Sequence, residues 1–212
     1  MIIINFKNYV SGKKVLILSR KIEKYLSKSI ICVPNSDISS ISEKTKLEIY
    51  AQHVDFQEEG KSTGYDIPED LKNSGAKGSL LNHSEHQVSL KVIEKTLSRC
   101  SGKLKIIVCA KNLSEVKNIL KMKFKPWAIA FEEPKLISSG KSITKYDSKK
   151  VLEFSNLLKS TKIIPICGAG ISSVEDILES ERLGCNGVLI SSVIAKNKNP
   201  EILLRKIKSI IV

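Results

Sequence analysis

Short apolar segments recur at nearly even intervals along the whole chain, and this repetition limits the folds open to it. Each segment is rich in Ile, Val and Leu, and polar or amphipathic stretches separate successive segments. Such alternation is typical of β-strands and α-helices that take turns in a parallel sheet. The apolar segments are residues 2–6, 29–33, 47–52, 78–82, 104–110, 127–131, 162–167 and 187–191.

Most of the stretches between these segments have the spacing of amphipathic helices. The expected helices are residues 15–26, 86–97, 114–122, 146–159, 173–183 and 200–210. The stretch after the third apolar segment has the weakest helical pattern.

Eight strands in 212 residues leave about 26 residues for each unit, which suffices for a strand, a helix and two short loops. Two α/β architectures accommodate such a series: a closed (β/α)₈ barrel and an open doubly wound sheet. The number eight favours the barrel. Because no linker, low-complexity segment or change in composition divides the chain, we expect residues 1–212 to form a single barrel domain.

The chain is strongly basic, with 35 Lys and Arg against 22 Asp and Glu and a net charge of +13. Nearly all of this charge is lysine spread in ones and twos, without interleaved aromatic residues, so we expect a solvated surface that attracts small anions rather than nucleic acid.

No apolar stretch approaches the ~18 residues of a membrane span, and the first residues lack signal-peptide features. We therefore expect a cytoplasmic protein with five free, mostly buried cysteines.

In a (β/α)₈ barrel the carboxyl ends of all strands form one face, so polar residues directly after the apolar segments converge on one site. These residues are Asn5, Lys7, Asn82, His83, Ser84, Glu85, Glu132, Glu133, Gly168, Ala169, Gly170, Ser191 and Ser192. A lysine, a histidine, carboxylates and a glycine-rich loop are thus expected on the same face.

The glycine-rich stretch after the seventh segment predicts a phosphate site. Gly168 and Gly170 let the backbone approach an anion, and a helix is expected to begin near Ser172 or Ser173. Ser191 and Ser192 follow the eighth segment, and the loops after strands seven and eight of such barrels often hold phosphate.

Beside a phosphate site, a carboxylate, an imidazole and an ammonium group suit proton transfer at a carbon next to a carbonyl. The carboxylate would abstract the proton, and the other two groups would stabilise the enediolate oxygen. No metal or organic cofactor is required. The three histidines, His53, His83 and His86, permit a metal site but do not require one.

Seven motifs together resemble the triosephosphate isomerase family, and in particular its short archaeal branch. They are NFKNY (5–9), AQHVD (51–55), STG (62–64), LLNHSEH (80–86), AFEEPKLISSGKS (130–142), CGAGIS (167–172) and NGVLISS (186–192). The resemblance covers nearly the whole chain and implies a TIM barrel that interconverts dihydroxyacetone phosphate and glyceraldehyde 3-phosphate in glycolysis and gluconeogenesis.

The resemblance also assigns roles to individual residues. Glu132 would be the base, His83 the neutral electrophile at the carbonyl oxygen, and Lys7, with Asn5 nearby, would stabilise the negative charge. In the family the neutral histidine lies at a helix N-terminus, and a helix opening near Ser84 and Glu85 would fit this pattern. The phosphate would be held by Ile137 and Ser138 of the lid and by Gly168, Gly170, Ser191 and Ser192.

Several positions depart from the family pattern. Glu133 stands where a lid-hinge proline is usual, and strand alternation places it on the face opposite Glu132. Ser138 and Val193 stand where glycine is common. His86 and Gln87 replace a basic pair, so that an ion pair made by Glu85 must be rewired or lost.

Other interpretations remain open at this point. Another phosphate-binding barrel, similar to thiamin phosphate synthase or indole glycerol phosphate synthase, would share the last two loops but would not need Asn5, Lys7, His83 and Glu132 together. A non-catalytic, basic RNA-binding protein would explain the charge alone. In the family the STG loop completes a neighbour's site, which implies a homodimer or homotetramer.

Overall fold

The computed structural model describes residues 1–133, 142–168 and 170–210. Its strands form a closed barrel in sequence order, and every strand pairs in parallel with its neighbours, with β1 beside β8. The strands are β1 (Ile2–Asn5), β2 (Ile30–Val33), β3 (Glu48–Ala51), β4 (Gly78–Leu81), β5 (Lys105–Ala110), β6 (Ala128–Phe131), β7 (Ile164–Cys167) and β8 (Gly187–Ile190). The expected (β/α)₈ barrel is confirmed, and each apolar segment contains one strand.

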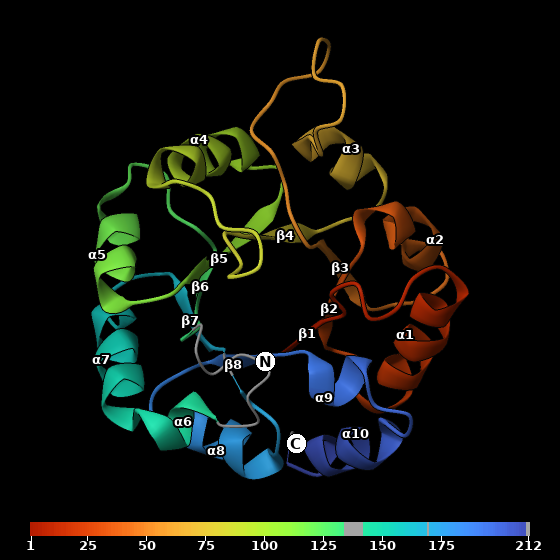
Figure 1. The fold of residues 1–212 in the computed structure, drawn as a ribbon, viewed down its shortest axis with the longest axis vertical. Coiled ribbons are helices and arrows are strands. Elements are labelled where there is room, and N and C mark those ends of the chain that lie inside the picture. The colour runs from red at the N-terminus through yellow and green to blue at the C-terminus, as the bar shows by residue number, and fades with distance from the viewer. Residues whose placement is uncertain (134–141, 169, 211–212) are drawn as a thin grey trace.

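Helices form an outer ring around the strands (Figure 1). They are α1 (Lys13–Tyr25), the 3₁₀ turn η1 (Asn35–Asp37), α2 (Ile38–Ser42), α3 (Pro68–Asn73), α4 (Leu90–Cys100), α5 (Leu113–Lys121), α6 (Ile143–Tyr146), α7 (Ser148–Leu158), α8 (Val174–Arg182), α9 (Ser192–Ala195) and α10 (Glu201–Lys208). Among the described residues, none of these helices is long and apolar enough to cross a membrane.

The apolar residues pack in two layers because side chains alternate along each strand. Ile3 points into the barrel, where it belongs to a cluster with residues from the other strands, including Leu80 and Ile107. Ile2 and Ile4 belong instead to the larger cluster between strands and helices. All five cysteines are free and buried, as expected.

The connection between β4 and α4 differs from the sequence expectation. A helix was expected from residue 86 and its opening near Ser84, but α4 begins at Leu90, where the Oγ atom of Ser89 accepts a hydrogen bond from the backbone of Val92. Ser84 and Glu85 lie in a turn closed by the backbone bond from His86 to the carbonyl of His83 (2.8 Å). The expectation was wrong because a serine cap further along the chain starts the helix.

The connection after β3 is the least regular, in agreement with its weak helical pattern. Residues 52–67 form a loop that projects beyond the ring of helices (Figure 1), and only then does α3 begin, with Pro68 in its first turn. Proline suits this position because it has no N–H to leave unpaired. The loop contains the STG motif at residues 62–64.

Candidate active site

The carboxyl ends of the strands bring together four of the residues predicted to act on the substrate. Asn5 ends β1, Lys7 and His83 follow β1 and β4 by two residues, and Glu132 directly follows β6. Their exposed fractions are 4% for Asn5, 9% for Lys7, 7% for His83 and 5% for Glu132. Charged groups are rarely buried to this extent without a specific partner or a functional role.

The backbone of Lys7 is held in an unusual conformation. Its φ angle is +46°, in the left-handed region that disfavours a side chain. Two hydrogen bonds fix it there: the backbone N–H donates to Oδ1 of Asn5 (2.9 Å), and the carbonyl accepts from Nε2 of Gln52 (3.0 Å). Such strain is typical of functional sites and persists only where surrounding contacts enforce it.

The ammonium group of Lys7 makes an ion pair with Glu85. Its Nζ atom lies 2.7 Å from Oε1 of Glu85, whose side chain is 55% exposed, whereas that of Lys7 is only 9% exposed. The ion pair of Glu85 is therefore present, although His86 and Gln87 replace the basic pair. Sequence reasoning placed Glu85 on this face but did not identify its partner.

The imidazole of His83 is oriented by the turn that follows it. The backbone N–H of Glu85 donates to Nδ1 of His83 at 3.2 Å, so Nδ1 is an acceptor and the neutral ring carries its proton on Nε2. Nε2 lies 3.7 Å from Oε1 of Glu132. A turn amide, rather than the start of a helix, thus selects the tautomer that presents an N–H to the site.

Glu132 lies over a glycine that leaves space for it. A Cβ atom at Gly168 would lie 2.6 Å from Cγ of Glu132, closer than real Cβ contacts. Within the described part of the chain, the buried Oε2 atom of Glu132 has no hydrogen-bond partner. Burial, together with nearby Glu132, raises the pKa of the Cys109 thiol well above its usual value, which keeps it neutral. A carboxylate with one oxygen left without a partner among the described residues is suited to accept a proton.

The two predicted phosphate loops lie after neighbouring strands. Gly168 and Gly170 follow β7, Gly170 with a φ angle of +73°, and the next helix, α8, begins after its capping residue Ser173, as expected. Ser191 and Ser192 lie at the start of α9, and the buried Oγ atom of Ser191 has no hydrogen-bond partner among the described residues. Ile137 and Ser138 lie outside the described residues.

A polar cavity of about 400 Å³ opens beside Lys7 and His83. Its lining adds residues that the sequence did not assign to the site, among them Gln52 and the pair His53 and His86. The rings of His53 and His86 stack with centroids 4.0 Å apart. The sequence could have indicated both histidines, because His53 lies in the segment after β3 and His86 in the segment after β4.

In the described part of the chain, the three histidines do not belong to a cluster with metal-binding geometry. Within residues 1–133, 142–168 and 170–210, no group of three His, Cys, Asp or Glu side chains is arranged to hold a metal ion. The rings of His53 and His86 stack on each other, and Nε2 of His53 lies 3.2 Å from Oδ1 of Asp55.

Comparison with known proteins agrees with this arrangement. The family model for triosephosphate isomerase matches residues 1–210. The chain is 36% identical to the triosephosphate isomerase of Sulfolobus acidocaldarius over 95% of this chain and 90% of that protein, and 37% identical to that of Sulfurisphaera tokodaii with the same coverage. It is 34% identical to the triosephosphate isomerase of Methanocaldococcus jannaschii over 98% of both chains. The chain therefore belongs to the triosephosphate isomerase family, as its motifs and its barrel predicted.

Proposed function

We propose that this chain interconverts dihydroxyacetone phosphate and D-glyceraldehyde 3-phosphate, and that Glu132, His83 and Lys7 carry out the reaction. Membership of the triosephosphate isomerase family supports the reaction. The observation that carries the assignment of residues is the approach of Oε1 of Glu132 to Nε2 of His83, at 3.7 Å, beside the buried side chain of Lys7. Nothing favours a different phosphate-binding barrel or an RNA-binding protein.

The proposed chemistry moves one proton between two neighbouring carbons. Glu132 removes a proton from C1 of dihydroxyacetone phosphate, and the C–H electron pair forms the C1=C2 bond of the enediolate. The Nε2–H group of His83 and the ammonium of Lys7 stabilise the negative oxygen. The Nε2–H group of His83 donates its proton to O2 and takes up the hydroxyl proton of O1, so the negative charge passes to O1. Glu132 then returns the first proton to C2, which gives the aldehyde at C1 and the hydroxyl group at C2. One carboxylate suffices because the proton leaves and returns on the same side of the substrate.

The phosphate group would be held on the far side of the mouth of the barrel. Gly168, Gly170, Ser191 and Ser192 are the proposed contacts, together with Ile137 and Ser138 of the lid segment. The positive φ angle of Gly170 and the unpartnered Oγ atom of Ser191 support this assignment. Holding a remote phosphate lets binding energy position the reacting carbons.

We also propose that the chain lies in the cytoplasm and that it assembles as a homodimer or a homotetramer. Two features support a subunit contact: the loop of residues 52–67 projects from the barrel, and the cavity beside Lys7 and His83 is polar and large enough to receive a loop. A C₂ dimer in which each loop enters the partner's cavity would satisfy both features at once.

The test is a coupled isomerisation assay of the wild type beside Glu132→Gln and Glu133→Gln, with protein concentration varied. We expect Glu132→Gln to lower kcat by about 10³-fold, within the range of general-base catalysis, because the amide cannot accept the proton. Glu133→Gln is the matched control, since its carboxylate is the next one along the chain, and we expect it to retain activity within about threefold.

Three outcomes would each contradict a part of the proposal. Wild-type activity no higher than the uncatalysed rate would eliminate the reaction. A larger loss of activity in Glu133→Gln than in Glu132→Gln would show that the base is Glu133 and not Glu132. A specific activity that does not fall on dilution, down to concentrations where sedimentation shows monomers, would eliminate the need for a partner subunit.

A further inference from the structure

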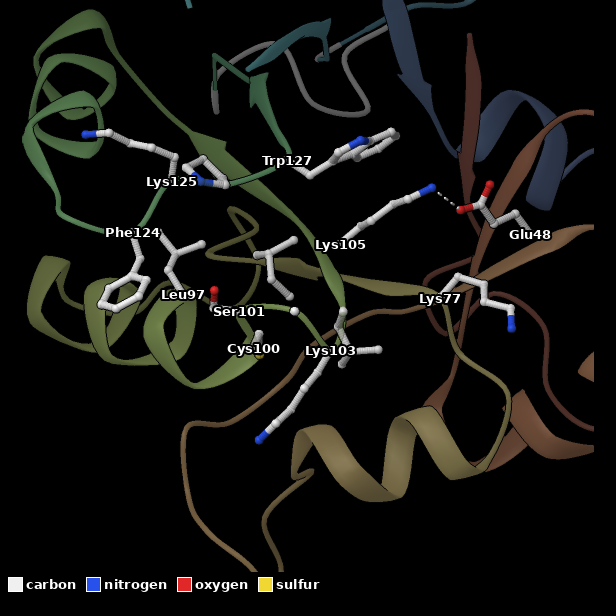
Figure 2. Close-up of a pocket in the computed structure, with 14 residues that line it drawn as sticks. Glu48, Lys77, Leu97, Cys100, Ser101, Lys103, Lys105, Phe124, Lys125 and Trp127 are labelled. Atoms are coloured by element: carbon white, nitrogen blue, oxygen red, sulfur yellow. Dashed lines mark hydrogen bonds and ion pairs between the residues drawn. The ribbon is translucent and has the colours of Figure 1, made fainter. Parts of the chain in front are cut away.

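A second cavity lies at the opposite end of the barrel from the candidate active site. It has a volume of about 470 Å³ and opens among the amino-terminal ends of the strands, between the C-terminal end of α4 and the segment that leads into β6. Glu48 and Lys105 are the first residues of β3 and β5, and Trp127 directly precedes β6 (Figure 2). Its size is in the range of pockets that hold small organic ligands.

One wall of this cavity is apolar and carries an aromatic ring. Leu97, Phe124 and the half-buried Trp127 line it. The indole of Trp127 lies 6.0 Å from the ring of Tyr50, which is buried in the barrel. A half-buried indole that is supported from within the barrel presents a fixed flat surface, on which a planar ring can stack.

The rim of the cavity is basic. Four lysines line it and only one carboxylate does so; these residues are Lys77, Lys103, Lys105, Lys125 and Glu48. The other carboxylate in reach is Glu69, and it already accepts two hydrogen bonds from Arg99 as well as one from Lys103. Positive charge therefore exceeds negative charge around the opening, which favours an anionic ligand.

Two of the four lysines already have partners within the protein, outside the lining of the cavity. The carboxyl ends of helices attract cations, and Nζ of Lys125 donates to the carbonyls of Leu120 and Met122 at the end of α5. Lys125 is thus engaged, as is Lys103 with Glu69. This leaves Lys77 and Lys105 as the lysines that can turn to a ligand.

Lys105 is well placed to contact a ligand on the indole. Its Nζ atom lies 5.1 Å from the centroid of the Trp127 ring and 2.9 Å from Oε1 of Glu48 (Figure 2). The side chains of Lys105 and Glu48 are 48% and 36% exposed. Because an exposed ion pair contributes little, the ammonium can exchange Glu48 for a bound anion at small cost.

We propose that this cavity binds a small anion that joins a planar ring to a phosphate group, the chemistry of a nucleoside phosphate. The ring stacks on Trp127 against the apolar wall, and Lys77 and Lys105 contact the phosphate. The site is separate from the isomerase site, so its test does not depend on activity.

The chain offers a direct measurement because Trp127 is its one tryptophan. Titration with ADP, followed by tryptophan fluorescence and by calorimetry, is expected to give a saturable change. Adenosine and inorganic phosphate are each expected to bind at least about tenfold more weakly, because each lacks one of the two contacts. Saturating dihydroxyacetone phosphate is expected to leave the affinity for ADP unchanged, since it occupies the other end of the barrel.

Two double variants test the role of the rim. Lys77→Gln/Lys105→Gln is expected to weaken ADP binding by about tenfold or more. The matched control is Lys28→Gln/Lys159→Gln, which removes the same charge from exposed lysines on the turns after α1 and α7, at the same end of the barrel, and is expected to leave the affinity within about twofold. Trp127→Ala is expected to weaken the binding measured by calorimetry.

Four results would overturn the proposal. They are the absence of a saturable response to ADP, an equal loss in both double variants, displacement of ADP by dihydroxyacetone phosphate, and a Trp127 signal that changes with protein concentration alone. The second would indicate attraction to the basic surface in general, and the last would indicate that another copy of the chain covers the cavity.

Discussion

Gly168 and Glu132 are in contact so close that the glycine cannot acquire a side chain without moving the carboxylate. A Cβ atom at Gly168 would lie 2.6 Å from Cγ and 3.3 Å from Oε1 of Glu132. The φ angle of Gly168 is not positive, so an alanine there is not strained by its backbone. The glycine is thus required for the position of the proposed base and not for the turn.

Gly168→Ala is expected to lower kcat by about 10²-fold, because a displacement of about 1 Å in a catalytic group can have that effect. The melting temperature should fall only modestly, since the side chain of Glu132 can rotate away but the Cβ atom would also lie 3.3 Å from the backbone oxygen of Phe131. Steady-state kinetics and thermal unfolding measure the two effects. Gly102→Ala is the control: its Cβ would meet no atom within 4 Å but its φ angle is +72°, so stability should fall while kcat is kept. An unchanged kcat in Gly168→Ala would contradict the prediction.

Gln52→Ala is expected to release the backbone of Lys7 from its left-handed conformation. The variant loses the hydrogen bond of 3.0 Å to the carbonyl of Lys7, one of two that enforce the φ angle of +46°. We expect kcat/KM to fall by about tenfold, the equivalent of one hydrogen bond in the transition state. Gln87→Ala, which removes an exposed glutamine on the same rim, should retain kcat/KM; a comparable loss there would contradict the argument.

Glu85→Gln tests whether its ion pair positions Lys7. The substitution keeps the size of the side chain and the backbone N–H that orients His83, but it removes the charge that lies 2.7 Å from Nζ of Lys7. We expect kcat to fall by about tenfold or more, with little change in stability because the carboxylate is 55% exposed. Kinetics and thermal unfolding are measured beside Glu94→Gln, on the exposed side of α4. Full activity in Glu85→Gln would show that Lys7 is held without it.

The stability of the folded chain is expected to fall as the pH decreases through the range in which histidine titrates. Burial, with a further contribution from nearby His86, lowers the pKa of His53 below its usual value, although Asp55 and Asp66 act in the opposite direction. The unfolded chain, with a histidine pKa of about 6.5, then binds more protons than the folded chain, so the free energy of unfolding decreases below about pH 6.5.

Denaturant unfolding between about pH 7.5 and pH 5.5 measures this effect. His53→Gln should show a shallower dependence on pH than the wild type, because it removes the group that resists protonation. His86→Gln is the matched control, since it leaves His53 buried and removes only the repulsion from the stacked ring. Identical pH profiles for His53→Gln and the wild type would contradict the assignment.

The sequence by itself determined the barrel and predicted which residues gather at one end of it. Eight apolar segments separated by stretches long enough for a helix leave few folds other than a closed parallel barrel, and residues that follow parallel strands must meet at one end of it. Asn5, Lys7, His83 and Glu132 were found in this way, and the structure does bring them together. Motif spacing also placed Glu132, rather than Glu133, at the position that is buried beside His83.

Only the tertiary structure decided how these residues are held. The pairing of Lys7 with Glu85 joins residues 78 positions apart, and the contact of Gly168 with Glu132 depends on how β6 and β7 lie side by side. Local periodicity also misplaced the start of α4, since it cannot weigh a serine cap against the turn that orients His83. Periodicity reports which face of an element is buried, whereas distances across the barrel depend on packing between strands that are remote in sequence.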